Sequence, residues 1–175
     1  MNKFRIIRFN EGSDYIYKEI EKDFDTYNKK AEQIIKTFEK DIGNALPKYF
    51  RLYLKELETV VSYIAGKDRD SDSKIWEYME YISFPKGRYK DIFVIGDLYS
   101  INEKATNYSK DFFLNEGKKN LLPIANNGSG DYLTISLTGA DSGKLFRWNH
   151  EYPEDDEQKV TSVANSFKDF LAGLG

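Results

Sequence analysis

The amino-acid sequence predicts an α+β domain, in which N- and C-terminal helices flank a mostly antiparallel sheet of about four to six strands. Apolar residues recur at every third or fourth position near both ends of the chain, which is the spacing of amphipathic helices. In between, β-branched and aromatic residues alternate with polar ones, and turns containing Gly separate them. The length of 175 residues fits one domain, so we expect a single unit over residues 1–175.

The composition excludes several kinds of functional site. The chain contains 12 Phe and 13 Tyr, which is enough aromatic surface to build a folded core. It has no Cys and one His, which rules out disulfides, a thiol nucleophile, Cys-ligated metals and His-rich metal sites. We therefore expect no metal, no cofactor and no enzymatic activity.

The first elements are a short strand and a long helix. Imperfect alternation predicts a strand over 3–9. Apolar residues at spacings of three and four predict an extended helix over about 14–42, which Gly43-Asn44 ends. A coiled-coil partner would use the same apolar stripe. Because the repeat stops at Gly43, packing on the domain's own core is favoured.

A second helix is predicted to begin at Leu46-Pro47, since Pro suits the first helical turn. The apolar spacing runs to about residue 57 and extends to 64 if the helix continues. The segment 60–64 is also β-branched and aromatic, and this fits a strand equally well. The sequence therefore leaves the structure of 58–74 open.

The loop over 65–73 carries three aspartates at alternate positions, Asp68, Asp70 and Asp72. Such a pattern begins a calcium-binding loop, but the Gly and the Glu that complete that loop are missing. A solvated charged loop is the simpler interpretation, and these residues are secondary candidates for a binding surface.

Strands dominate the middle of the chain. We expect strands over 75–84 and 91–101, the second kinked at Gly96, then a short helix over 102–114. The run 121–125 predicts an edge strand, because Pro123 lacks a backbone donor. Two alternating runs at 132–137 and 144–150 predict a hairpin. Apolar residues from Val160 to Leu174 stand at helical spacing and predict a closing amphipathic helix.

The charge is small overall but uneven. With 26 basic and 29 acidic residues the net charge is −3, which argues against nucleic-acid binding. No apolar run is long enough to cross a bilayer and the N-terminus is no signal peptide, so we expect a cytoplasmic protein that binds no membrane. The acidic excess lies in the last third, and most of it is concentrated in Glu151, Glu154, Asp155, Asp156 and Glu157.

This acidic run has two interpretations. A run of charged residues between a strand and a helix usually forms a solvated loop that places acidic side chains at the helix N-terminus. Alternatively, clustered carboxylates would steer the chain onto a basic partner, with Tyr152 as an aromatic anchor. Trp148 is a further candidate for this contact, although packing at the sheet is the commoner role of such a residue.

The second half of the chain has a recognisable order of motifs. Leu122-Pro123-Ile124-Ala125 precedes a turn, Gly128-Ser129-Gly130-Asp131, in which the glycines allow positive φ and Asp131 can accept bonds from turn amides. A strand, a Trp148-Asn149-His150 segment and a closing Ser166-Phe167-Lys168-Asp169-Phe170-Leu171 helix follow. Together with an earlier Leu46-Pro47-Lys48-Tyr49 helix start, this order resembles the SUKH superfamily, whose core is the Smi/Knr cell-wall-assembly-regulator domain.

The resemblance implies an α+β domain without catalytic residues. Bacterial members of the superfamily are typically immunity proteins that bind and neutralise a cognate toxin, often a nuclease, and fungal members are interaction hubs. We therefore expect a protein toxin as the partner. A regulatory interaction module unrelated to toxins is the alternative, and a small hydrolase using His150, Glu151 and Asp131 is a weaker one. The oligomeric state is left open.

Overall fold

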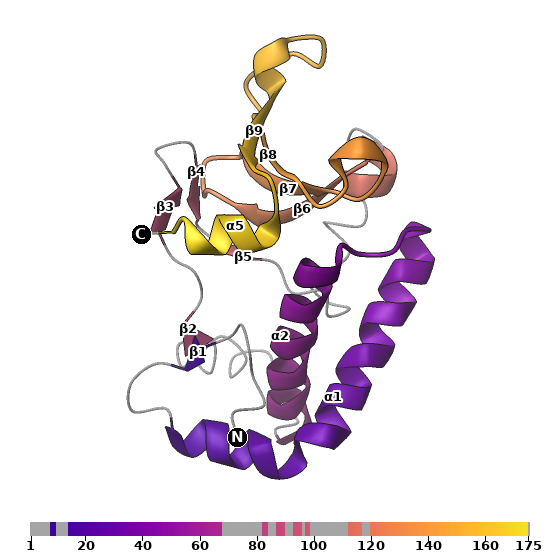
Figure 1. Ribbon diagram of the computed structural model, residues 1–175, viewed down its shortest axis with the longest axis vertical. Coiled ribbons are helices and arrows are strands. Elements are labelled where there is room, and N and C mark those ends of the chain that lie inside the picture. The colour runs from indigo at the N-terminus through magenta and orange to yellow at the C-terminus, as the bar shows by residue number, and fades with distance from the viewer. Residues whose placement is uncertain are drawn as a thin grey trace.

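Two helices lie at one end of the molecule and a five-stranded sheet lies at the other (Figure 1). The computed structural model describes residues 8–9, 14–67, 82–83, 87–89, 93–95, 97–98, 112–116 and 120–174. Of the loop predicted over 65–73, residues 65–67 are helical instead, and Asp68, Asp70 and Asp72 lie outside the described residues, as does most of the strand predicted over 75–84.

The two long helices form an antiparallel pair. Helix α1 spans Asp14–Ile42, as its apolar spacing predicts, and Gly43 ends it with a positive φ of 67°. The Asn44 amide then donates to the Glu39 carbonyl at 3.1 Å, which satisfies one of the carbonyls that a helix end leaves free. Helix α2 spans Lys48–Lys67.

Helix α2 settles the question left open at residues 60–64. Val60 and Val61 are 0% and 2% exposed and belong to the apolar stripe that α2 buries in the core. The segment is therefore helical, and the strand alternative is wrong for it. Burial against the rest of the domain outweighs the modest β-preference of Val.

Charged side chains join the two helices outside the core. Glu32 of α1 lies 2.6 Å from Nη2 of Arg51 and 3.1 Å from Nζ of Lys55, both on α2. Glu39 lies 3.1 Å from Nε of Arg51 and also accepts from the Leu46 amide at 2.9 Å. The hydrogen bond from Arg51 is the main cause that lowers the pKa of Glu32 to about 2.

The main sheet is antiparallel, with the strand order β5-β6-β7-β8-β9. Two shorter antiparallel pairs, β1–β2 and β3–β4, complete the described strands. The predicted α+β architecture is confirmed. The strands are β1 (Arg8–Phe9), β2 (Ile82–Ser83), β3 (Gly87–Tyr89), β4 (Phe93–Ile95), β5 (Asp97–Leu98), β6 (Leu121–Asn126), β7 (Tyr132–Ser136), β8 (Leu145–Trp148) and β9 (Val160–Ala164).

The predicted hairpin is confirmed as β7 and β8, joined through the 3₁₀ turn η2 (Gly139–Asp141). The expectation that 121–125 forms an edge strand is wrong, because β6 lies between β5 and β7. Its pairing with β7 shifts between Pro123 and Ala125, and such an irregularity accommodates a residue that cannot donate to the ladder.

The closing helix is shorter than predicted. Helix α5 spans only Phe167–Ala172, whereas Val160–Ala164 forms strand β9 and pairs with β8. The β-branched residues of this segment favour the strand. Ser166 then caps α5 by accepting from the Asp169 amide at 3.1 Å. Of the short helix predicted over 102–114, the described part is a π-helical turn, η1 (Phe112–Glu116).

One core joins the helices to the sheet. The ring of Phe167 on α5 lies 5.0 Å from the rings of Phe50 and Tyr53 on α2. Leu133 and Ile135 of β7 belong to the same core and are fully buried. The helix pair and the sheet are therefore packed on a shared apolar interior.

Candidate partner-binding loop

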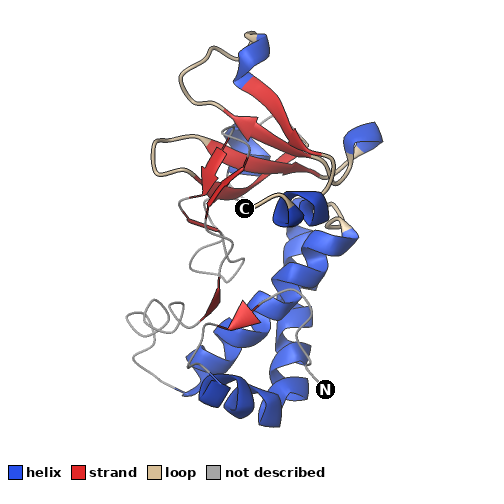
Figure 2. Ribbon diagram, turned by 60° about the vertical axis from the view of Figure 1, so that its left-hand side comes forward, coloured by secondary structure: helices blue, strands red, loops and turns tan. Residues whose placement is uncertain are grey.

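The segment between β8 and β9, residues 149–159, projects beyond the rest of the sheet (Figures 1 and 2). We call it the acidic loop. It contains the predicted binding residues Glu151, Tyr152, Glu154, Asp155, Asp156 and Glu157. Tyr152 and Asp156 are partly buried and the other four are exposed. A short 3₁₀ turn, η3 (Glu157–Lys159), leads from the loop into β9.

Asp131, at the end of the predicted Gly turn, anchors the start of this loop. Its side chain is buried and accepts hydrogen bonds from the His150 amide at 3.2 Å and from Nε of Arg147 at 2.8 Å. The His150 ring lies beside it, with Nδ1 2.9 Å from Oδ1 of Asp131. One carboxylate thus connects the β6–β7 turn, strand β8 and the acidic loop.

The ionisation of Asp131 reflects these contacts. Burial alone would raise its pKa, but the hydrogen bonds from His150 and Arg147 outweigh burial and lower it. The carboxylate is therefore charged at neutral pH. His150 thus makes a strand-end hydrogen bond to Asp131, and the structure brings together two of the three residues named for the hydrolase alternative.

Gly130 allows the His150 ring to lie against the turn. It has a φ of 99°, and a Cβ atom at this position would lie 2.9 Å from Nδ1 of His150. Gly128 also has a positive φ, 76°, but a Cβ there would meet no atom within 4 Å. Gly130 is therefore required both for its backbone conformation and for the close approach of the His150 ring, whereas Gly128 is required for its backbone conformation alone.

Lys159 anchors the acidic loop through contacts of its side chain. It is 4% exposed, and its Nζ donates to the Tyr152 carbonyl at 2.6 Å. The same Nζ lies 3.9 Å from the centre of the Trp148 ring and 3.4 Å from the carboxylate of Glu154. The backbone closes the loop as well, because the Asn149 amide donates to the Lys159 carbonyl at 2.8 Å.

These contacts divide the five acids of the loop into two groups. Asp156 accepts from the Gln158 amide at 2.8 Å and caps η3, and Glu154 pairs with Lys159. Glu151, Asp155 and Glu157 are exposed, and within the described part of the chain their carboxylates pair with no cation. We call these three residues the free acids.

Comparison with known proteins gives the family of this domain. The family model of the SMI1 / KNR4 family (SUKH-1) matches residues 30–173. The chain belongs to this family. No curated protein and no solved structure matches the chain. The SUKH-1 match spans α2, the main sheet, the acidic loop and α5, and it begins inside α1.

Trp148 of this SUKH-1 domain packs at the outer side of the sheet. Its ring stacks on Tyr132 with centroids 5.5 Å apart and meets Phe112 of η1 edge-on at 5.2 Å. Lys159 lies over the ring as described above. Trp148 thus supports the acidic loop from below, while part of its own surface is accessible.

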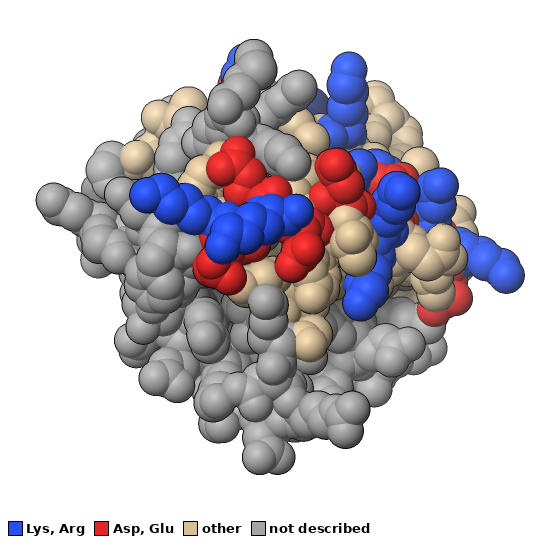
Figure 3. Space-filling model, turned by 90° about the horizontal axis from the view of Figure 1, so that it is seen from below, with Lys and Arg blue, Asp and Glu red and all other residues tan. Residues whose placement is uncertain are grey.

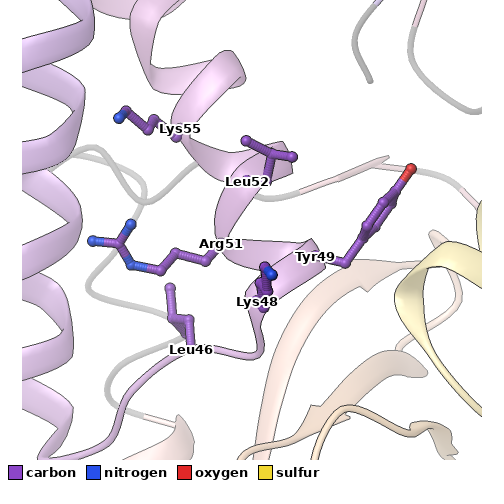
Figure 4. A pocket seen from close by; sticks show the side chains of 6 residues that line it. All are labelled: Leu46, Lys48, Tyr49, Arg51, Leu52 and Lys55. Atoms are coloured by element: carbon purple, nitrogen blue, oxygen red, sulfur yellow. The ribbon is translucent and has the colours of Figure 1, made fainter. Parts of the chain in front are cut away.

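Sequence reasoning missed a groove on α2. It has a volume of about 710 Å³, and its described lining is Leu46, Lys48, Tyr49, Arg51, Leu52 and Lys55 (Figure 4). Arg51 and Lys55 pair with acids of α1, and Lys48, the third cation of the lining, is exposed at the start of α2. Viewed from below, at the helical end of the molecule, acidic and basic side chains lie side by side on the surface (Figure 3).

The other residues missed from sequence are Arg147 and Lys159, which fix the acidic loop. Nothing in the local sequence marks them, since charged side chains are mostly exposed and their partners are distant in the chain. In the residues that the structure describes, no group of acids and histidines is arranged to bind a metal ion, and no helix is long and apolar enough to cross a membrane.

Proposed function

We propose that this SUKH-1 domain is an immunity protein that binds a cognate bacterial toxin and neutralises it by covering its active surface, without catalysis of its own. The observation that carries the proposal is the acidic loop, a projecting segment that is fixed from within and displays three free acids. Membership of the SUKH-1 family supports a protein partner.

The loop suits a basic partner. A nuclease toxin needs a positively charged cleft to hold phosphates, and clustered carboxylates are drawn into such a cleft at long range. Because Asp131 and Lys159 already hold the loop, little conformational freedom is lost when it binds. Preorganised charge of this kind favours fast and specific association.

The direct test is co-expression with the protein encoded by the gene immediately upstream, which we expect to be the toxin. The two proteins should purify as a complex, and cells that carry both should survive expression of the toxin. An absence of complex together with an absence of protection would overturn the proposal. Protection by a chain that leaves the toxin intact and bound would support neutralisation by occlusion.

The role of the free acids is tested by their neutralisation in the triple variant Glu151→Gln, Asp155→Asn and Glu157→Gln. We expect association with the toxin to slow about tenfold at low ionic strength, and by much less in high salt. The measurement is stopped-flow association at several salt concentrations.

The matched control is neutralisation of three acids on helix α1, Glu19→Gln, Glu21→Gln and Asp25→Asn, which removes equal charge from the opposite end of the molecule. This control should associate nearly as fast as the wild type. Equal slowing of the two triple variants would show that net charge, rather than the acidic loop, governs association. Asp156 stays unchanged in the test because it caps η3.

A further inference from the structure

We propose that Asn127 is a site of spontaneous covalent modification, in which water replaces its side-chain amide and the carboxylate that results loosens the anchor of the acidic loop. Asn127 is the one asparagine of the sequence that Gly follows. Gly128 has no Cβ atom to shield its backbone nitrogen from the side-chain carbonyl carbon of Asn127. Neither the reaction nor its consequence requires a partner protein, so the site is independent of the proposed function.

The modification proceeds in two steps. In the first, solvent base takes the amide proton of Gly128, its nitrogen forms a bond to Cγ of Asn127, and the Cγ–Nδ2 bond breaks. Nδ2 takes up a proton from water and leaves as ammonia, and a succinimide ring remains. In the second step, water opens this ring. Opening at Cγ gives aspartate, and opening at the backbone carbonyl carbon gives isoaspartate, in which the main chain runs through the side chain.

The turn around Asn127 favours the first step. Oδ1 of Asn127 accepts hydrogen bonds from the backbone amides of Ser129 at 2.9 Å and of Asp131 at 3.1 Å. Negative charge develops on this oxygen when a nucleophile attacks Cγ, and two amide donors stabilise such charge, as they do in an oxyanion hole. The contact with Ser129 also folds the side chain back along the peptide that carries the Gly128 nitrogen.

The Gly128 amide lies where solvent base can reach it. It donates to Oδ1 of Asn126 at 2.9 Å, and this contact has to open before the proton is lost. Gly128 is exposed, and a Cβ atom built on it would meet no atom within 4 Å. There is therefore room both for the opening of the contact and for the succinimide ring.

The product acts on the acidic loop through Asp131. In the unmodified chain Nδ2 of Asn127 donates to Oδ2 of Asp131 at 3.2 Å. Modification puts a negatively charged oxygen where this donor was, so that two carboxylates face each other. Asp131 is buried, and solvent therefore screens their repulsion only weakly. Since the same carboxylate accepts from the His150 amide and from Arg147, displacement of Asp131 releases the start of the acidic loop.

The first experiment follows the reaction itself. The purified full chain is kept in mildly alkaline buffer at body temperature, and peptides from samples taken over several weeks are analysed by liquid chromatography and mass spectrometry. We expect Asn127 to convert about fivefold faster or more than Asn165, an exposed asparagine that precedes Ser166. Gly128→Ala should slow the conversion about fivefold or more, because its Cβ atom shields the nitrogen.

The same samples contain the outcome that contradicts the proposal. If Asn127 stays intact in the folded chain but converts in the chain unfolded by urea, its hydrogen bonds protect the side chain, and the proposal is wrong.

The second experiment measures the consequence on the variant Asn127→Asp, which has the aspartate product from the start. We expect hydrogen exchange in residues 149–159 to become about fivefold faster and Tm to fall by about 3 °C. Asn165→Asp adds the same charge at an exposed position and is the control, which should exchange like the wild type. Unchanged exchange in Asn127→Asp would show that Asp131 tolerates a second carboxylate, and would overturn the link between the modification and the acidic loop.

Discussion

Gly130 illustrates how one residue fixes the start of the acidic loop. Its positive φ and its closeness to the His150 ring both exclude a side chain. Gly128, two residues before, has the same kind of backbone conformation without the close neighbour. The two positions therefore form a natural pair for separating backbone strain from steric exclusion.

We expect Gly130→Ala to destabilise the chain by about 1–2 kcal/mol more than Gly128→Ala. Both variants carry the strain of positive φ, but only the first displaces the His150 ring from Asp131. Chemical denaturation measures the difference. Equal losses of stability would show that the ring moves aside without cost.

Lys159 is the residue on which the shape of the acidic loop depends most. We expect Lys159→Met to lower stability by about 1–3 kcal/mol, because it keeps the buried aliphatic volume and leaves the Tyr152 carbonyl unpaired. Hydrogen exchange should become faster in residues 149–159. Lys168→Met, at an exposed position of α5, is the control. Unchanged exchange in the loop would show that the backbone closure alone fixes it.

At the scale of the elements, the ion pairs between α1 and α2 make their packing dependent on pH. The pKa of Glu32 falls from 4.5 to about 2 in the folded chain. A lowered folded pKa means that this contribution to stability is complete above about pH 4.5 and is lost as the pH falls toward 2.

The variant Glu32→Gln removes this dependence. We expect it to lose about 1 kcal/mol of stability at pH 7, because Glu32 and its two partners, Arg51 and Lys55, are only partly buried. Thermal unfolding as a function of pH is the measurement. The difference from the wild type should shrink below pH 4.5, and a difference that stays constant down to pH 2 would contradict the assignment.

Sequence spacing predicted the elements where a single pattern was present. Helix α1 was predictable because apolar residues repeat without interruption until Gly43 ends them. Strand β9 was not, since Val160, Val163 and Ala164 fit a helical stripe as well as a strand. Pairing with β8, which the local sequence does not encode, decided between the two.

The position of the acidic loop was predictable from the sequence, but the contacts that hold it were not. A run of acidic residues can be recognised from sequence alone, so residues 151–157 could be singled out as a candidate. The distinction between free and structural acids depends on Lys159 and Asp131, whose contacts join residues distant in the chain. Only the folded chain brings these residues together.

At the scale of the whole molecule, the shared core couples the helix pair to the sheet. Phe167 of α5 contacts Phe50 and Tyr53 of α2, and its side chain is 1% exposed. The chain should therefore unfold in one transition rather than losing the helices and the sheet separately.

Phe167→Ala tests this coupling. We expect it to lower stability by about 3–5 kcal/mol, as the loss of a large buried aromatic side chain does. The coupling itself is measured on the wild type. Its unfolding curves from far-ultraviolet circular dichroism, which follows the helices, and from tryptophan fluorescence should coincide. Two separate transitions in the wild type would show that the helix pair folds independently of the sheet.

The division between free and structural acids has a consequence for evolution. Gly130, Asp131 and Lys159 set the shape of the acidic loop, while Glu151, Asp155 and Glu157 contribute charge without holding it in place. Substitutions at the three free acids can therefore change the surface charge of the acidic loop with little loss of folding stability. Under the proposed function, a lineage that meets an altered toxin has three positions at which to adapt, and divergence among close relatives should concentrate there.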